Sequence, residues 1–569
     1  MSRRGHTRIR NEHARAPVAA AVAIGVALGF ALLAAPAPAA SLRPTGAETA
    51  VLVQPDPAPS TGPGRPRGKP GPEAWQFRPT DRGDLRRAKQ RAKGGGGRPK
   101  APGQSGPLGA TSVSANADGL FWGDNLARNL GVPADPTGAA GPDYYFEHVN
   151  SVVGTYNRTS LTQTNEDQLD VFTGPTGLAT FDPQVQWDQE AQRWLYVSIG
   201  EESATARSFI VFGWSRTTNP SAGFGGANWC RYAIDTGVRL DDYPKLGHSD
   251  RHILIGTNVF NGNTFETSRI WALPKPVNGA TVCPTSFGIP YFGSPSSPLE
   301  TADGGEAFTP VPANTVEADG GSGYVVAADD PSITANQLMV WRVAGTKGSP
   351  TLEEVGEVGV SSYAVPANAP QPTGKDLDTL DARLTQAVAQ PDPDRAGAEA
   401  IWTQHTINGP GGRSAARWYE LLPGACSAGS CPAGALAQEG TISDASAYIF
   451  NAAISPTATG DAAAIQYNRG GSSDLVSIRA QSRVSGDAAG TMGGEQVLVT
   501  SSETANDFSC TGGPRQYCRW GDYAGASPDP ADASTVWGTN MYNGADSGGS
   551  SKVGWYTRNF ALVPQTAAP

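Results

Sequence analysis

Ten residues between positions 182 and 523 combine the side-chain types that bind polar ligands. They recur near the starts of similar segments, and they are Asp182, Asp242, Tyr243, Lys245, Asp381, Arg383, Arg519, Trp520, Asp522 and Tyr523. Carboxylates, guanidinium groups and tyrosines supply the donors and acceptors that hold a sugar or a peptide, and Trp520 offers a flat face for stacking. The pattern predicts a ligand-binding surface that these residues share.

The same aspartates leave two other interpretations open. A pair such as Asp242 and Asp522 can serve as general acid and base on a glycosidic bond if the two carboxyl groups are suitably separated. Alternatively, an aspartate that recurs in many segments can simply bond turn amides within each of them. We expect binding of an extracellular glycan or protein surface. A glycoside hydrolase or lyase, whose catalytic residues the sequence does not identify, and a non-catalytic wall-associated scaffold are the alternatives.

Seven similar segments position these residues. Each has an Asp or Pro near its start, a strand of small residues, a polar turn and a more hydrophobic strand. The segments begin near Asp135, Asp182, Asp242, Thr309, Asp381, Ser455 and Asp522. Successive starts lie 47 to 74 residues apart, which is the length of a propeller blade of about four strands.

From residue 116 onward, the sequence pattern is typical of a β protein. Short apolar stretches such as Trp194–Ile199 and Phe209–Trp214 alternate with Gly, Asp, Asn and Pro clusters, and helical periodicity is almost absent. A ring of blades covers the apolar faces that a lone four-stranded sheet exposes. We predict a single-domain all-β propeller over 116–569, with seven blades preferred over six or eight, and tandem β sandwiches as the alternative.

Several phrases in this region resemble a known family. DPTGAAGPDYYFEHVNS, DPQVQWDQEAQRW, DYPKLG and RWGDYAGASPDP look like signatures of secreted bacterial sialidase-like (BNR-type) propeller proteins, most of which have no assigned activity. The resemblance covers roughly residues 130–565 and implies the architecture. The aspartate box of true sialidases is missing, and Arg269-Ile270-Trp271 lacks the proline of their Arg-Ile-Pro segment. Sialidase activity is therefore not implied.

The amino terminus predicts export. Arg3, Arg4, Arg8, Arg10 and Arg15 precede an apolar run from Val18 to Ala35, and Ala37-Pro38-Ala39 offers the small residues of a cleavage site. We interpret residues 1–39 as a signal peptide and the mature protein as secreted, with no stable membrane span. A transmembrane anchor is the alternative, because the run is nearly long enough to cross a bilayer.

Residues 40–115 are predicted to form a disordered linker, because prolines, the Gly94–Gly97 run and the basic cluster Arg86-Arg87-Ala88-Lys89 leave few apolar residues to offset the entropy of ordering. Residues 1–115 carry a net charge of +12 and the remainder −22. The acidic body disfavours nucleic acid as a partner. The basic linker is either a spacer or an attachment to an anionic cell-wall polymer.

Cysteines and aspartates suggest two kinds of stabilising site. Six cysteines agree with export, and their spacing predicts the pairs Cys230–Cys283, Cys426–Cys431 and Cys510–Cys518 out of 15 connectivities. The acidic residues Asp241, Asp329 and Asp330 supply hard oxygen ligands for a structural calcium ion, which is the one cofactor that the sequence suggests.

Overall fold

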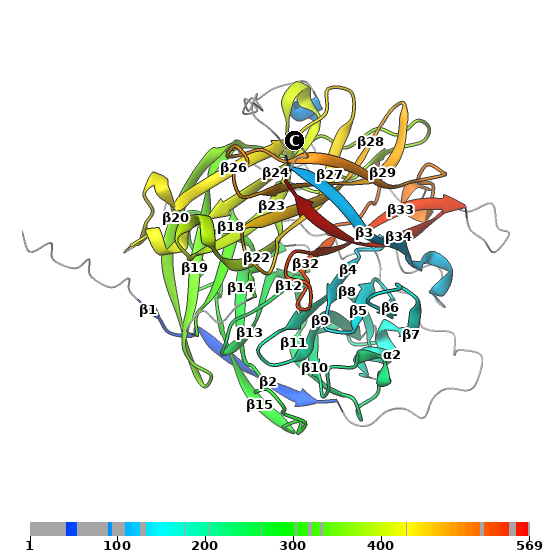
Figure 1. The fold of residues 1–569 in the computed structure, drawn as a ribbon. Coiled ribbons are helices and arrows are strands. Elements are labelled where there is room, and N and C mark those ends of the chain that lie inside the picture. Colours follow the sequence, from blue (N-terminus) through cyan, green and yellow to red (C-terminus); the bar gives the residue numbers. More distant parts are fainter. Residues whose placement is uncertain are drawn as a thin grey trace, which may run out of the picture. The chain divides into compact units, whose positions relative to one another are not determined.

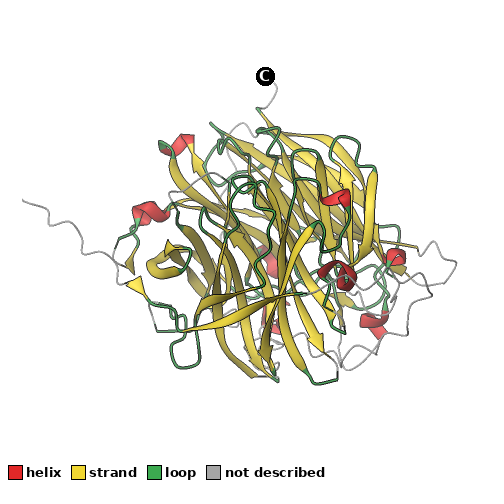
Figure 2. Cartoon of the chain, turned by 90° about the horizontal axis from the view of Figure 1, so that it is seen from below, coloured by secondary structure: helices red, strands yellow, loops and turns green. Residues whose placement is uncertain are grey.

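The computed structural model describes residues 41–53, 89–93, 109–125 and 133–566, apart from gaps at 176, 203, 263, 302–303, 317–320, 330–333, 428, 512–516 and 546–552. The predicted signal peptide lies outside these residues. Strands dominate the described chain and its helices are short (Figure 2). The α-helices whose bounds are described are α2 (Leu169–Thr173) and α3 (Phe508–Thr511). No helix among the described residues is long and apolar enough to cross a membrane.

Strand pairing within the described residues forms seven four-stranded antiparallel units, here called blades 1 to 7. Blade 1 contains β4 (Thr137–Ala140), β5 (Tyr144–Val149), β6 (Val152–Asn157) and β7 (Gln163–Gln168). Blade 2 contains β8 (Ala179–Asp188), β9 (Arg193–Glu202), β10 (Arg207–Ser215) and β11 (Trp229–Gly237). Blade 3 contains β12 (Arg239–His248), β13 (His252–Asn261), β14 (Thr264–Pro274) and β15 (Ser286–Phe292).

The remaining blades repeat this order. Blade 4 contains β16 (Phe308–Pro312), β18 (Gly323–Ala328), β19 (Ala335–Thr346) and β20 (Ser349–Tyr363). Blade 5 contains β22 (Leu384–Asp392), β23 (Ala398–Asn408), β24 (Ser414–Leu421) and β26 (Leu436–Ile442). Blade 6 contains β27 (Tyr448–Pro456), β28 (Ala462–Gly471), β29 (Asp474–Val484) and β30 (Gly493–Thr500). Blade 7 contains β32 (Gly525–Pro528), β33 (Val536–Ala545), β34 (Val553–Gln565) and β3 (Ala110–Phe121).

Short elements connect or flank the blades. The short strands are β1 (Ser41–Leu42), β2 (Gly46–Leu52), β17 (Asn314–Thr315), β21 (Asp376–Leu377), β25 (Gly429–Ser430) and β31 (Tyr517–Cys518). The 3₁₀ turns are η1 (Trp122–Asp124), η2 (Pro220–Ala222), η3 (Pro393–Arg395), η4 (Pro410–Gly412), η5 (Pro423–Ala425) and η6 (Ala433–Ala435).

The ring is closed by strands from the two ends of the described chain. The innermost strands contact one another in the order β4, β8, β12, β16, β22, β27 and β32, and β32 in turn contacts β4. In blade 7, β3 pairs antiparallel with β34, so an amino-terminal strand completes the carboxy-terminal sheet (Figure 1). Closure hides the edge that a linear row of blades would expose. The fold is an all-β propeller, as the sequence predicts.

The apolar core lies between successive blades. Trp214 of blade 2 and Trp271 of blade 3 belong to one buried cluster, and the Tyr145 ring of blade 1 stacks on Trp537 of blade 7 at 5.0 Å. Ten tryptophans that the sequence spreads over the repeats are all buried, namely Trp187, Trp194, Trp214, Trp271, Trp341, Trp402, Trp418, Trp520, Trp537 and Trp555. Their burial fits a core that joins sheets face to face.

Parts of the predicted linker are ordered, contrary to expectation. β2 pairs with both β11 and β15 and so lies between blades 2 and 3, residues 89–93 form a helical turn, and β3 begins at Ala110 rather than after residue 115. The reason for β2 is local: Ala50-Val51-Leu52 is a short apolar run in a polar segment, and it covers two sheet edges. β1 also pairs with β20, and residues 40, 54–88 and 94–108 of the linker lie outside the described ones.

Three disulfides join the predicted pairs. Cys230–Cys283, Cys426–Cys431 and Cys510–Cys518 are all present, which confirms the pairing inferred from spacing. The first closes a separation of 53 residues and the second only 5. A disulfide stabilises chiefly by restricting the unfolded chain, so the long closure contributes more.

Replacing Cys230 and Cys283 together with serine should therefore lower the free energy of unfolding by about 4 kcal/mol, against about 2 kcal/mol for Cys426 and Cys431. Chemical denaturation of the two double variants beside the wild type measures both losses. Equal losses would show that loop length does not govern the contribution of these bonds.

Candidate functional site

Each of six blades bends sharply where its inner strand begins. A non-glycine residue takes a left-handed backbone conformation at this place, with φ of 46° at Asp135, 52° at Asp182, 56° at Tyr243, 55° at Thr309, 61° at Leu380 and 49° at Asn451. Such conformations are uncommon and cost free energy, so a repeated occurrence requires support from the surroundings. β-bulges occur at the same place in β8, β12, β16 and β27. The bends bring one short segment of each of these blades towards the ring axis.

The bends assemble a polar group that we call the axial cluster. It consists of Asp135, Asp182, Asp242, Tyr243, Lys245, Asp381, Arg383, Arg519, Asp522 and Tyr523. Nine of the ten residues predicted from the sequence belong to it. Asp135 was not among the predicted site residues, although it begins the first repeat and the same alignment could have identified it.

Hydrogen bonds tie the cluster together across blades. The Asp522 backbone N–H donates to Asp135 Oδ1 at 2.6 Å, and Asn150 Nδ2 donates to Asp135 Oδ2 at 2.9 Å. Asn150 Oδ1 in turn accepts from the Asp182 N–H at 2.7 Å. The Tyr243 hydroxyl donates to the Asp522 carbonyl at 2.8 Å. Blades 7, 1, 2 and 3 are therefore joined at the axis by polar contacts.

Two arginines neutralise part of the acidic charge. Arg383 Nε and Nη2 each donate to one oxygen of Asp381 at 2.7 Å, a bidentate pair, and Arg519 forms an ion pair with Asp522. The Arg383 guanidinium also lies 4.5 Å from the ring centre of Tyr243. Paired and stacked arginines are the form in which proteins bury such charges.

Lys245 has no such carboxylate partner. Its Nζ lies 3.9 Å from the ring centre of Tyr243 and 3.6 Å from that of Tyr523, between two aromatic faces. The side chain is 1% exposed, and Nζ, Asp242 Oδ1 and the Tyr523 hydroxyl have no hydrogen-bond partner in the described chain. Buried polar atoms without a partner are rare and point to a bound ligand or water.

Burial shifts the pKa values of the cluster strongly. It raises the pKa of Asp242 to about 7, with Arg383 opposing the shift and the Asp522 charge adding to it. Burial together with neighbouring carboxylates also raises the pKa values of Asp135 and Asp182 well above the ordinary range. The pKa of Lys245 is lowered well below its usual value by burial. Burial thus opposes the charged forms of both the acids and the base of this cluster.

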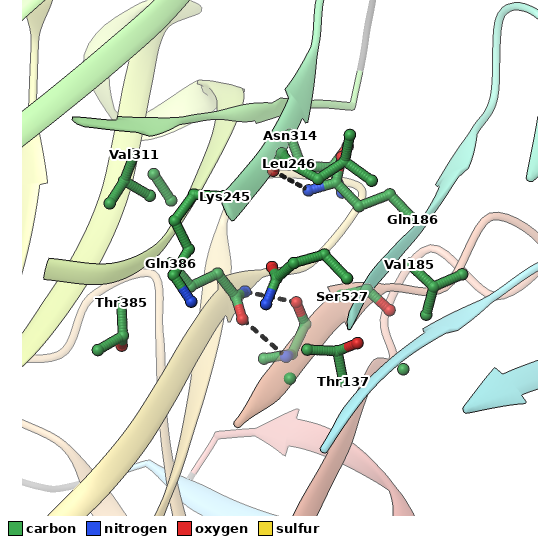
Figure 3. Close-up of a pocket in the computed structure, with 15 residues that line it drawn as sticks. Thr137, Val185, Gln186, Lys245, Leu246, Val311, Asn314, Thr385, Gln386 and Ser527 are labelled. Carbon is green, nitrogen blue, oxygen red and sulfur yellow. Dashed lines mark hydrogen bonds between the residues drawn. The ribbon is translucent and has the colours of Figure 1, made fainter. Parts of the chain in front are cut away.

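A narrow cavity of about 20 Å³ adjoins the cluster inside the ring (Figure 3). Lys245 belongs to both. The residues that line the cavity come from inner strands and from β17, and they are Thr137, Gly138, Gln184, Val185, Gln186, Lys245, Leu246, Val311, Asn314, Thr385, Gln386, Ala387, Gly525, Ala526 and Ser527. The Gln386 side chain narrows the cavity. Its Oε1 accepts from the Ala526 N–H of β32 at 3.0 Å, and its Nε2 donates to the Ala526 carbonyl at 2.5 Å.

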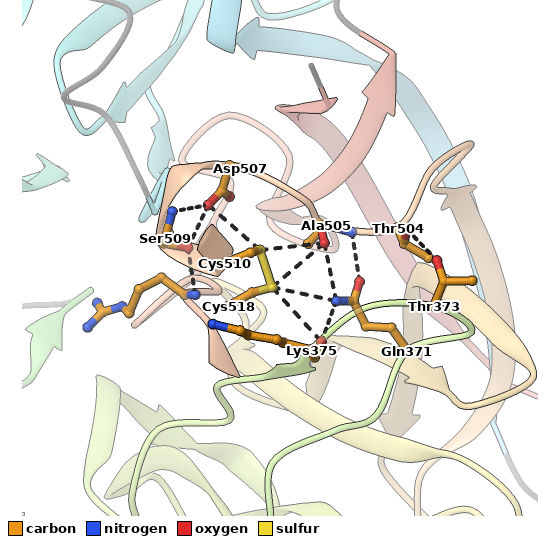
Figure 4. The surroundings of a disulfide bond; sticks show 10 residues. Gln371, Thr373, Lys375, Thr504, Ala505, Asp507, Ser509, Cys510 and Cys518 are labelled. Atoms are coloured by element: carbon orange, nitrogen blue, oxygen red, sulfur yellow. Dashed lines mark hydrogen bonds between the residues drawn. A yellow bond between two sulfur atoms is a disulfide. The ribbon is translucent and has the colours of Figure 1, made fainter. Parts of the chain in front are cut away.

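Two long connections next to the cluster hold Arg519 in place. β21 pairs with β31, and the Cys510–Cys518 disulfide braces the second connection (Figure 4). Gln371 bonds the backbone of Ala505 across the two connections, and the Ser509 hydroxyl accepts the Arg519 N–H at 2.8 Å. The sequence did not reveal this bracing, because it depends on contacts between segments more than 130 residues apart.

Trp520 does not offer the predicted stacking face. It is 1% exposed, donates from Nε1 to Asn468 Oδ1 at 2.8 Å and packs edge-on to Phe450. These residues follow the end of β31 at Cys518, and there Arg519 pairs with Asp522 in the cluster while Trp520 fills the core. Its role is structural.

Two of the aspartates predicted to bind calcium, Asp241 and Asp329, are not members of the cluster. Asp241 accepts from Thr257 Oγ1 at 2.8 Å and from Arg269, and the Asp329 N–H donates to the Tyr363 hydroxyl. Asp330 lies outside the described residues. Among those described, no three His, Cys, Asp or Glu side chains are grouped to hold a metal ion. The calcium site stays a prediction.

Comparisons with known proteins return propellers of distant sequence. No family model and no curated protein matches the chain. The extracellular domains 1–2 of Drosophila semaphorin 1a are 10% identical, with 79% of this chain and 88% of that chain covered and a TM-score of 0.35. An exo-β-1,3-galactanase of Phanerochaete chrysosporium is 10% identical over 80% and 100%, with a TM-score of 0.27.

A GH43 endo-arabinanase of Bacillus licheniformis is 12% identical over 52% of this chain and 94% of that chain, with a TM-score of 0.25. At such identities and TM-scores these similarities carry no argument about ligand or reaction. The class defined by the strands and the axial cluster is a propeller with a buried polar centre. The sialidase-like assignment remains a prediction.

The raised pKa of Asp242 predicts a pH dependence of stability. The pKa of Asp242 rises from its ordinary value of 3.8 to about 7 in the folded chain. Between these two pH values the folded chain keeps a proton that the unfolded chain releases, so the free energy of unfolding falls as the pH rises from 4 towards 7. Asp242→Asn should flatten this slope by up to about 1.4 kcal/mol per pH unit. Denaturation curves between pH 4 and 8 measure it.

Asp532→Asn is the matched control. Hydrogen bonds from the Ser534 and Thr535 side chains lower the pKa of Asp532, so its contribution is lost only below pH 4. The slope between pH 4 and 7 should stay as in the wild type. An Asp242→Asn protein with an unchanged slope would mean that Asp242 is already ionised in the folded chain.

Proposed function

We propose that this chain is a secreted propeller that binds an extracellular glycan in the axial cavity, with Lys245 as the central contact. The observation that carries the proposal is the Lys245 amine, which is buried, lines the cavity and has no hydrogen-bond partner in the described chain. A ligand hydroxyl that meets this nitrogen would satisfy it. The three disulfides fit the oxidising compartments through which secreted proteins pass.

The lining of the cavity supports a small polar ligand over a flat protein surface. The Asn314 amide and the Ser527 hydroxyl add donors and acceptors to the Lys245 amine. Such a set suits the hydroxyl groups of a neutral glycan end.

The same lining favours binding over hydrolysis. Cleavage of a glycosidic bond by the usual route requires two carboxyl groups that reach the bond. None of the residues lining the cavity is an aspartate or glutamate, and Asp242 is only 4% exposed. In the glycoside hydrolase alternative, the two carboxylates that contact the ligand would have to be Asp182 and Asp522, which are partly exposed members of the cluster.

Lys245→Met keeps most of the length of the side chain and removes the nitrogen, so the affinity for a bound glycan should fall at least about tenfold. Isothermal calorimetry with a panel of neutral oligosaccharides measures the change. Lys93→Met, a change at an exposed lysine, should leave the affinity unchanged.

Two results would contradict the proposal. Equal affinities of Lys245→Met and the wild type would remove Lys245 from the site. Products released from the same oligosaccharides by the wild type, but not by folded Asp242→Asn and Asp522→Asn proteins, would replace binding by hydrolysis.

A further inference from the structure

A helical turn from the amino-terminal linker docks next to the axial cluster. It comprises residues 89–93 and begins at Lys89, the last residue of the basic cluster Arg86-Arg87-Ala88-Lys89 of the sequence. Lys89 Nζ donates to three oxygens: Asn368 Oδ1 at 2.5 Å, Asp378 Oδ1 at 3.0 Å and Thr379 Oγ1 at 3.5 Å. An ammonium group carries three N–H donors, so three acceptors match its capacity.

The fold itself holds these three oxygens in place. Asp378 is 2% exposed, Thr379 3% and Asn368 9%. The Asp378 carboxylate also accepts the Leu380 N–H at 3.2 Å, and the Thr379 hydroxyl donates to the Ala367 carbonyl at 2.9 Å. None of these supporting bonds involves the linker. The oxygens therefore form a pocket built by the connection between β20 and β22.

The linker makes few other contacts that would hold the 89–93 turn at this pocket. Lys93 pairs with Asp376, but the two side chains are 52% and 29% exposed, and exposed ion pairs contribute little stability. Ala92 is buried but small. Within the described turn, Lys89 is the one side chain that penetrates deeply, at 11% exposure.

The pocket is adjacent to the axial cluster. Leu380, two residues beyond Asp378, packs against the rings of Tyr243 and Tyr523. The charge of Asp378 also acts on Arg519. A group bound in this pocket therefore lies beside the residues that surround Lys245.

We propose that Asn368, Asp378 and Thr379 form an ammonium-binding subsite, which the chain's own Lys89 occupies as an internal pseudo-ligand. A primary ammonium of an external ligand, such as a lysine side chain or an amino group, binds there when the 89–93 turn leaves. This subsite prefers a cation and does not depend on the neutral glycan proposed for the cavity. Either proposal can therefore be contradicted while the other stands.

The test uses the wild-type chain and three variants, Lys89→Ala, Lys89→Met and Lys93→Ala, with n-butylammonium chloride as the probe. Lys89→Ala vacates the pocket, so its melting temperature should rise saturably with n-butylammonium, by about 2 °C or more at high occupancy. The wild type and Lys93→Ala keep Lys89 and should respond no more than they do to sodium chloride of equal ionic strength.

Lys89→Met and a second probe sharpen the outcome. The methionine fills the volume without a charge, so Lys89→Met should respond less than Lys89→Ala. Tetramethylammonium has the charge but no N–H donors, and it should not stabilise Lys89→Ala. An equal response of Lys89→Ala, Lys93→Ala and the wild type to n-butylammonium, or an equal effect of tetramethylammonium on Lys89→Ala, would overturn the subsite.

Discussion

The burial of many charges at one point on the axis is the constraint on which the rest of the molecule depends. Five aspartates, two arginines and a lysine meet where water has little access. Isolated charges in such a place cost several kcal/mol each, so they must be paired, stacked or neutralised. Asp381 and Arg383 are paired, Lys245 lies between two rings, and Asp242 has a raised pKa. Every blade must therefore hold its inner strand at a fixed distance from the axis.

Closure of the ring supplies the rigidity that this arrangement requires. β3 and β34 join in blade 7, and the buried Glu147 of blade 1 accepts hydrogen bonds from the Leu120 N–H of β3 and from Asn559 of β34. The joint is thus tied to the neighbouring blade. The six left-handed residues at the inner strands are tolerated because packing on both sides over-determines them. Strain near the axis is offset by apolar burial between the blades.

The sequence predicted the fold and most of the candidate site for a clear reason. Inner strands start in similar local surroundings, so aspartates recur there, and an alignment of Asp182, Asp242 and Asp522 locates the axis. The disulfides were predictable because two short spacings, Cys426–Cys431 and Cys510–Cys518, leave Cys230 and Cys283 as the third pair. Trp520 was misassigned because the sequence does not say which way a side chain faces near a bend. β2 and the 89–93 turn were missed because their partners lie far away in the chain.

Burial and nearby charge act on Lys245 in opposite directions. Burial lowers the pKa of its amine, whereas the negative charges of the neighbouring aspartates raise it. The rings of Tyr243 and Tyr523 lie 3.9 and 3.6 Å from Nζ and give the amine aromatic faces in place of a carboxylate partner. Nζ therefore keeps hydrogen-bonding capacity for a hydroxyl-bearing ligand in the cavity, whereas the Asp378 pocket suits a cation.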